Sequence, residues 1–216
     1  MGKGRWIPWS VALVGLAIAV YLFKFDGQIH GYDEYLVTNI GCLLFIPMLY
    51  IFLVARQEPA SFGFTLGDSS SGFKYASLLF VCVFPVLFIA SRMTDFQQYY
   101  PLQKWAQTSL RLFLYFELTY GLYLFCWEFF FRGFLLFGLF RGIGWWAVPA
   151  QALVFGILHW GKPGPEIIAS FITGVILGIV ALKVKSFMPC FLVHWAAAVT
   201  FDILVITTRH GTFIRL

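Results

Sequence analysis

The chain has 216 residues, of which 60% are apolar and only 12% are charged. A soluble domain averages about 45–50% apolar and about 25% charged residues. The 26 Phe, 8 Trp and 10 Tyr residues exceed what the interior of a soluble fold of this size can hold, so much of the apolar surface must face lipid. This composition excludes a disordered chain, a secreted disulfide-rich domain and an ordinary cytosolic enzyme.

The charged residues favour a membrane protein over a nucleic-acid binder. The net charge is +5, and the 15 Lys and Arg residues are scattered between apolar runs rather than gathered in a block. We therefore expect no nucleic-acid partner, and we interpret these residues as flanks of membrane helices. Apart from Arg132 they divide evenly between the two sides of the predicted topology, and only Lys3 and Arg5 favour a cytoplasmic N-terminus.

Seven apolar runs predict membrane-spanning helices, which need about 20 mostly apolar residues. In chain order they are Trp6 to Phe25, Leu36 to Ala55, Phe73 to Ser91, Ser109 to Phe140, Trp145 to Trp160, Pro165 to Leu182 and Phe187 to Thr207. The first run also resembles a signal peptide, but it is long for one and more spans follow, so we interpret it as a retained helix. Composition predicts a loop over Arg56 to Gly72 and an interfacial segment over Arg92 to Thr108.

The run from Ser109 to Phe140 is too long for a simple span, because an α-helix rises about 1.5 Å per residue. We expect it to tilt, kink or leave the membrane, and a break near Gly133 would raise the helix count from seven to eight. The sequence therefore predicts an all-α, polytopic membrane helix bundle of about 7–8 transmembrane helices. We expect residues 1–216 to form a single integral-membrane domain, embedded in the lipid bilayer of the plasma membrane.

Ionisable side chains within the predicted helices are the candidate functional residues, because such groups are costly in a membrane and tend to be functional or paired. Six side chains qualify as candidates, on three of the helices: Glu117, Glu128, Arg132, His159, His194 and Asp202. These three helices are where we expect a site.

Glu128 and Arg132 are four residues apart, which places them on one helical face in the order that favours an ion pair. Two interpretations remain open. The pair is either structural, or it is a carboxylate near a hydrolytic centre that is oriented by the arginine. Glu117 lies eleven residues before Glu128, too far to share one centre, and we expect it to make a satisfied polar contact.

His159 and His194 bring two imidazoles into the same bundle, and we expect them to converge close to Glu128. Two histidines and a carboxylate can activate water or hold a metal ion. If zinc is bound, its ligands would be these three residues, although the H-E-x-x-H signature is absent. Cys126 is a chemically feasible nucleophile, but a buried thiol beside Trp127 is more simply explained by packing.

The three motifs Glu128-xxx-Arg132-Gly133, Phe155-xxx-His159 and His194-xxx resemble those of the CPBP family. This family comprises the CAAX-processing type II prenyl endopeptidases and bacteriocin-processing proteins, also called Abi. Its pattern is Glu-Glu-xxx-Arg, Phe-xxx-His, and His-xxx-Asn or a similar polar residue, in that order on consecutive membrane helices. The family-like core covers about residues 73–205.

The resemblance implies an intramembrane glutamic-type endopeptidase that hydrolyses a membrane-associated or lipidated peptide with water activated by Glu and His. We expect no cofactor, with zinc as the possible exception. In the family, the first Glu and the Phe-xxx-His histidine activate water, and the last His and Asn stabilise the oxyanion. Carried over residue by residue, Glu128 matches the second Glu and Arg132 matches the Arg. His159 matches the base-side His, and His194 matches the oxyanion-side His.

Two positions depart from the family pattern. Trp127 replaces the first Glu and cannot take a proton from water, and Ala198 replaces the Asn. Losing one oxyanion donor typically lowers the rate about 10²–10³-fold, and Asp202 is not an equivalent donor. We favour a divergent protease that uses Glu128, His159 and His194. The alternatives are a catalytically inactive scaffold or chaperone that binds lipidated or membrane peptides, and a small transporter, against which the absence of an internal repeat counts.

Overall fold

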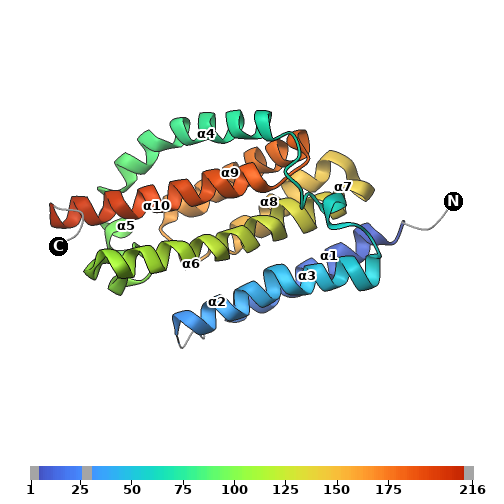
Figure 1. The fold of residues 1–216 in the computed structure, drawn as a ribbon, viewed down its shortest axis with the longest axis horizontal. Coiled ribbons are helices and arrows are strands. Elements are labelled where there is room, and N and C mark those ends of the chain that lie inside the picture. Colours follow the sequence, from blue (N-terminus) through green and yellow to red (C-terminus); the bar gives the residue numbers. More distant parts are fainter. Residues whose placement is uncertain (1–4, 26–30, 212–216) are drawn as a thin grey trace.

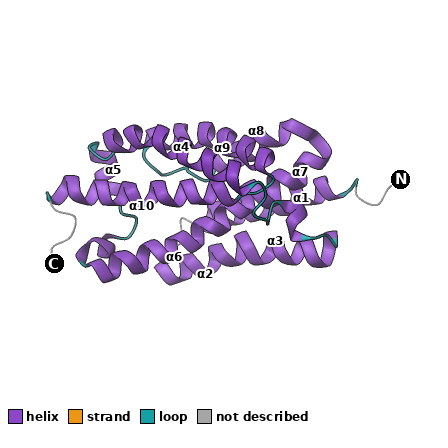
Figure 2. Cartoon of the chain, turned by 45° about the horizontal axis from the view of Figure 1, so that its top comes forward, coloured by secondary structure: helices purple, strands orange, loops and turns teal. Residues whose placement is uncertain are grey.

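The structure is a computed structural model that describes residues 5–25 and 31–211. In this part of the chain all regular structure is helical, as the sequence predicts (Figures 1 and 2). The α-helices are α1 (Ile7–Phe25), α2 (Tyr32–Ile40), α3 (Ile46–Leu49), α4 (Ser69–Ala90), α5 (Thr94–Tyr99), α6 (Leu110–Glu128), α7 (Leu136–Ile143), α8 (Ala147–Ile157), α9 (Gly164–Val184) and α10 (Met188–His210). The π-helical segments are Gly41–Phe45, Tyr50–Ala55 and Phe129–Leu135, and the 3-10 segments are Pro59–Phe62, Lys104–Thr108 and Gly144–Trp146.

Six helical segments of the described chain are long and apolar enough to cross a membrane. They are Ile7–Phe25, Tyr32–Ala55, Ser69–Ala90, Leu110–Ile157, Gly164–Val184 and Met188–His210. The fourth contains a sharp turn at Gly144, whose φ of 56° and ψ of −137° suit a residue without a side chain. This turn separates α6 and α7 from α8, which has 11 residues and is about 16 Å long. The predicted run at Trp145 to Trp160 is therefore helical but does not reach across a hydrocarbon core of about 30 Å.

The long run after Ser109 is not broken near Gly133. Instead, a π-helical segment, Phe129–Leu135, joins α6 to α7 without interruption. A Cβ atom on Gly133 would lie 2.9 Å from the carbonyl oxygen of Phe62 and 2.8 Å from the Phe129 ring. Gly133 therefore allows the loop before α4 to pack directly on this segment. Such wider turns often occur at functional sites.

The start of α4 differs from the prediction. Asp68 accepts a hydrogen bond from the backbone N–H of Ser71 (3.1 Å), which caps the helix N-terminus. The polar residues from Ser69 to Gly72, which composition assigned to a loop, therefore form the first turn of α4.

Helix α10 packs against both α4 and α6, and this arrangement positions the candidate site (Figure 1). A Cβ atom on Gly121 of α6 would lie 2.7 Å from the indole of Trp195 on α10, so only glycine permits this approach. The Trp195 indole N–H donates to the carbonyl oxygen of Glu117 (3.0 Å). This close contact places His194, the neighbour of Trp195, against α6.

Candidate active site

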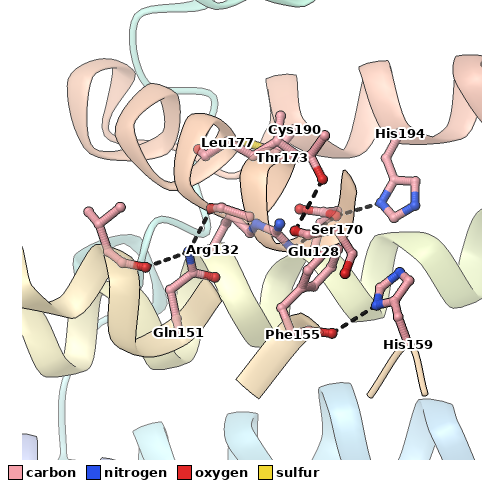
Figure 3. A network of polar contacts seen from close by, with 12 residues as sticks. Glu128, Arg132, Gln151, Phe155, His159, Ser170, Thr173, Leu177, Cys190 and His194 are labelled. Carbon is pink, nitrogen blue, oxygen red and sulfur yellow. Dashed lines mark hydrogen bonds and ion pairs between the residues drawn. The ribbon is translucent and has the colours of Figure 1, made fainter. Parts of the chain in front are cut away.

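A buried carboxylate joins the cationic and imidazole groups of the site (Figure 3). Glu128 is the last residue of α6, directly before the π-helical segment. Its Oε1 accepts hydrogen bonds from His194 Nδ1 (2.6 Å) and from Arg132 Nη1 (3.3 Å). Glu128 and Arg132 are both 0% exposed, whereas 26% of the His194 side chain is exposed. Of these three side chains, only His194 is accessible, so Glu128 can affect a bound molecule only through the His194 ring.

Arg132 is fully buried, and its guanidinium lies 3.9 Å from the centroid of the Phe155 ring. An aromatic face attracts a cation, and more strongly where water is excluded. The Nε and Nη2 atoms of Arg132 have no hydrogen-bond partner among the described residues. Arg132 thus contacts Glu128 and the rings of Phe155 and Phe131, and its positive charge compensates the charge of the Glu128 carboxylate.

His159 lies in the turn after α8 and is 6% exposed. Its Nδ1 is 2.8 Å from the carbonyl oxygen of Phe155. A carbonyl only accepts, so Nδ1 bears the proton, and in the neutral ring Nε2 has a free lone pair. The Phe155 ring lies 4.5 Å from the His159 ring and 6.4 Å from the His194 ring, centroid to centroid. The Phe155 ring therefore lies near both imidazoles.

Two cavities adjoin both histidines. The first, of about 330 Å³, reaches α2 and α6 and includes Asn39 and Trp127 in its wall. The second, of about 440 Å³, lies between α4, α9 and α10, and its wall is mostly apolar. His159 and His194 line both cavities. Glu128 lines neither of them.

The sequence predicts that both histidines lie close to Glu128. The structure places His194 in hydrogen-bond contact with Glu128, whereas His159 bonds the carbonyl oxygen of Phe155. Trp127 lines the first cavity, and its ring centroid lies 5.9 Å from that of His159. Ala198 lines the second cavity one helical turn beyond His194.

The zinc alternative does not fit this arrangement. Among the described residues, no three His, Cys, Asp or Glu side chains are grouped so that they would hold a metal ion. Glu128, His159 and His194 therefore do not form a common ligand set among the described residues. Cys126 is 0% exposed and lines neither cavity, which agrees with a packing role.

Two features of the site were not predicted. Asn39 of α2 lies in the wall of the first cavity, and its Nδ2 donates to the carbonyl of Tyr35 (2.9 Å). Lys162 lies in the wall of both cavities and contacts Glu166 Oε1 (2.7 Å) and the Tyr100 hydroxyl (3.2 Å). Burial opposes the charge of Lys162, but Tyr100 and Glu166 raise its pKa well above the ordinary value. The four-residue spacing of Lys162 and Glu166 could have indicated their contact from the sequence alone. Nothing in the sequence singled out Asn39 as a residue of the cavity wall.

Comparison with known proteins gives one family match. Residues 108–200 match the family model described as type II CAAX prenyl endopeptidase Rce1-like, which covers somewhat less than half of the chain. This range contains Glu128, Arg132, His159 and His194. No curated protein and no solved structure matches the chain.

Proposed function

We propose that this chain, whose residues 108–200 match the family model of type II CAAX prenyl endopeptidases, is a CPBP-family intramembrane protease that hydrolyses a membrane-associated peptide with water activated by His194. The observation that supports this mechanism best is the 2.6 Å contact between Glu128 and His194. It joins a fully buried carboxylate to an imidazole that lines both cavities. Glu128 is a positioning residue, and His194 is the general base.

The reaction follows from the protonation states of the two groups. An ionised carboxylate only accepts, so His194 Nδ1 bears a proton and Nε2 is the free base. Nε2 takes a proton from water, and the hydroxide attacks the peptide carbonyl carbon. The negative charge of Glu128 stabilises the imidazolium that results. The imidazolium then returns the proton to the departing amine nitrogen as the C–N bond breaks, leaving a carboxylic acid and an amine.

His159 orients the water in this proposal. Its free Nε2 accepts a hydrogen bond from the second water hydrogen, which directs a lone pair of the oxygen at the carbonyl. The ring itself is held by the bond from Nδ1 to Phe155. No proton needs to pass through His159.

The second cavity indicates which substrates fit. Its wall is mostly apolar, and it lies between α4, α9 and α10, which are all long and apolar enough to cross a membrane. A lipidated or membrane-associated peptide would bury apolar groups there beside His194. We propose that the enzyme acts in the plasma membrane and uses no metal.

The test is hydrolysis in liposomes by the purified protein, with a library of membrane-tethered peptides. Wild type is expected to cleave, and His194→Ala is expected to lose at least about 10²-fold in kcat, because general-base catalysis contributes about 10²–10⁴. His210→Ala, which removes an exposed histidine of the same helix, is the matched control and should retain the wild-type rate. Equal rates for wild type and His194→Ala would refute the proposal.

A non-catalytic scaffold is the second candidate, and Trp127 favours it. This ring stands at the position where the family has its first Glu, and it packs 5.9 Å from His159. A scaffold would bind the same peptides in the two cavities without cleaving them. In that case, binding would survive in His194→Ala and turnover would be absent from wild type.

A further inference from the structure

Two hydroxyl groups of α9 line the second cavity, and the reaction proposed above uses neither of them. They belong to Ser170 and Thr173, which share this cavity with His194 (Figure 3). Ser170 is 4% exposed, and its hydroxyl donates to the carbonyl oxygen of Ile167 (2.7 Å). The Thr173 hydroxyl donates to the carbonyl oxygen of Ser170 over a longer distance (3.3 Å). Both hydroxyls thus bond to the backbone of their own helix.

The register of α9 and α10 places these hydroxyls beside the proposed base. The two helices run antiparallel, because only three residues, 185–187, join the end of α9 to the start of α10. The thiol of Cys190 donates to the carbonyl oxygen of Leu177 (3.3 Å), so these two residues lie at one level of the helix pair. One helical turn further from the connection, Thr173 on α9 is level with His194 on α10.

Ser170 lies about 4.5 Å beyond the level of His194, since it is three residues from Thr173 along α9. A second contact supports this placement. A Cβ atom on Gly174, one turn from Ser170, would lie 3.5 Å from Cδ1 of Phe155, and the Phe155 ring lies 6.4 Å from the His194 ring. The Ser170 hydroxyl is therefore in the same part of the cavity as the water that His194 would activate.

Hydrolysis in this cavity needs a hydrogen-bond donor for the oxyanion, because the attacked carbonyl oxygen becomes negative and the wall is mostly apolar. The stronger donors of the wall either act on the water or bond to Glu166; they are His159, His194, Lys162 and Tyr100. The remaining hydroxyl donors in the described part of the wall are those of Ser170 and Thr173.

The position of the carbonyl oxygen favours Ser170 over Thr173. Water stands between the base and the carbonyl carbon, so the oxygen on that carbon lies a few ångströms beyond the base. Ser170 lies beyond the level of His194, whereas Thr173 lies at that level. Ser170 is also the more buried of the two, and a donor stabilises an oxyanion more strongly where water is excluded.

We infer that the Ser170 hydroxyl donates a hydrogen bond to the oxyanion, which makes Ser170 a further catalytic residue; this inference rests on the proposed function. The hydroxyl rotates away from the Ile167 carbonyl, which keeps its backbone partner within α9. A neutral substrate carbonyl is no better an acceptor than that of Ile167, but an oxyanion forms a stronger hydrogen bond. The contact therefore forms in the transition state and raises kcat without lowering KM.

Turnover of Ser170→Ala in liposomes tests this role, since Ala removes one oxygen and favours the helix. We expect kcat to fall about 10²–10³-fold, with KM and the Tm close to those of wild type. Ser170→Thr retains the hydroxyl and should keep most of kcat. In the Ser170→Ala background, Ala198→Asn brings an amide donor from the facing helix and should restore part of kcat.

Ser91→Ala is the matched control. Ser91 is 0% exposed, and its hydroxyl donates to the carbonyl oxygen of Phe88, three residues earlier (2.9 Å), as that of Ser170 does to Ile167. Ser91 lines neither cavity. This variant therefore loses the same kind of bond outside the site and should keep the wild-type rate.

A binding measurement tests the donor without requiring turnover. An acyl-anchored peptide carries a phosphinate, an anionic tetrahedral group, in place of each amide in turn. Its affinity in nanodiscs is compared with that of the same peptide carrying a neutral ketomethylene group. Wild type should bind the phosphinate at least about tenfold more tightly at one position, since hydrogen bonds to charged groups are the strong ones. Ser170→Ala should lose most of this preference, and Ser91→Ala should retain it.

A folded Ser170→Ala with undiminished kcat, or with the phosphinate preference of wild type, would overturn the inference and leave the proposed hydrolysis intact. A loss of kcat accompanied by a large fall in Tm would also overturn it, because it would give Ser170 a structural role. A phosphinate preference that depends on Ser170, in a wild type without turnover, would contradict the proposed hydrolysis and leave the oxyanion-binding hydroxyl in place.

Discussion

Glu128→Gln separates the proposed role of the carboxylate from a purely structural one. Glu128 is fully buried, and its Oε1 lies 2.6 Å from His194 Nδ1. Gln has nearly the same shape and can accept a hydrogen bond from His194 or Arg132, but it has no charge to stabilise an imidazolium. We expect kcat to fall about 10³–10⁴-fold, as it does when the carboxylate partner of a catalytic histidine is neutralised elsewhere.

The same change has a limited effect on folding. Removing one partner of a buried ion pair costs about 3–5 kcal/mol, but Gln retains an acceptor for Arg132, so the loss should be smaller. KM should stay unchanged because Glu128 lines neither cavity. Glu128→Asp, which restores the charge, should recover part of kcat.

The assay is steady-state cleavage of one membrane-tethered peptide in liposomes, with thermal unfolding of each variant as the folding control. A folded Glu128→Gln with undiminished kcat would remove Glu128 from the mechanism. A change confined to KM would instead mean that Glu128 contacts the substrate, against the geometry described above.

Four further changes test other parts of the account. Arg132→Leu leaves Glu128 charged without its cation and should lower the free energy of unfolding by about 3–5 kcal/mol; an unchanged unfolding curve would argue against the buried pair. His159→Ala should lower kcat about 10²–10⁴-fold if the ring orients the water, and a change in KM alone would show a binding role. Ala198→Asn should raise kcat by up to about 10²–10³-fold if a missing oxyanion donor limits the rate; no increase would mean that another donor is in place. Gly133→Ala should lower the Tm because its Cβ would lie 2.9 Å from a backbone carbonyl oxygen, and retention of the wild-type Tm would show that this contact relaxes.

The helices were predictable from composition because a membrane-spanning helix needs a contiguous run of about 20 mostly apolar residues. Each of the seven predicted runs is helical in the structure. The length of α8 was not predictable in this way, since apolar residues continue through Trp145 and Trp160 while the backbone ends the helix at Ile157. The π-helical segment after Glu128 likewise has no compositional signal.

Within the site, only local contacts could be predicted. The pairing of Glu128 with Arg132 followed from their four-residue spacing within one helix. The bond from Glu128 to His194 joins residues far apart in the chain, and it depends on the approach of α10 to α6 over Gly121. The same limit applies to Asn39, whose place in the cavity wall depends on how α2 packs.

Comparing the turnover of wild type with that of Trp127→Glu decides whether this chain hydrolyses peptides in spite of Trp127. Both proteins are purified, placed in liposomes and given the same library of membrane-tethered peptides. We predict measurable turnover by wild type that depends on His194. If wild type shows no turnover and Trp127→Glu gains it, the natural chain is a scaffold and not a protease.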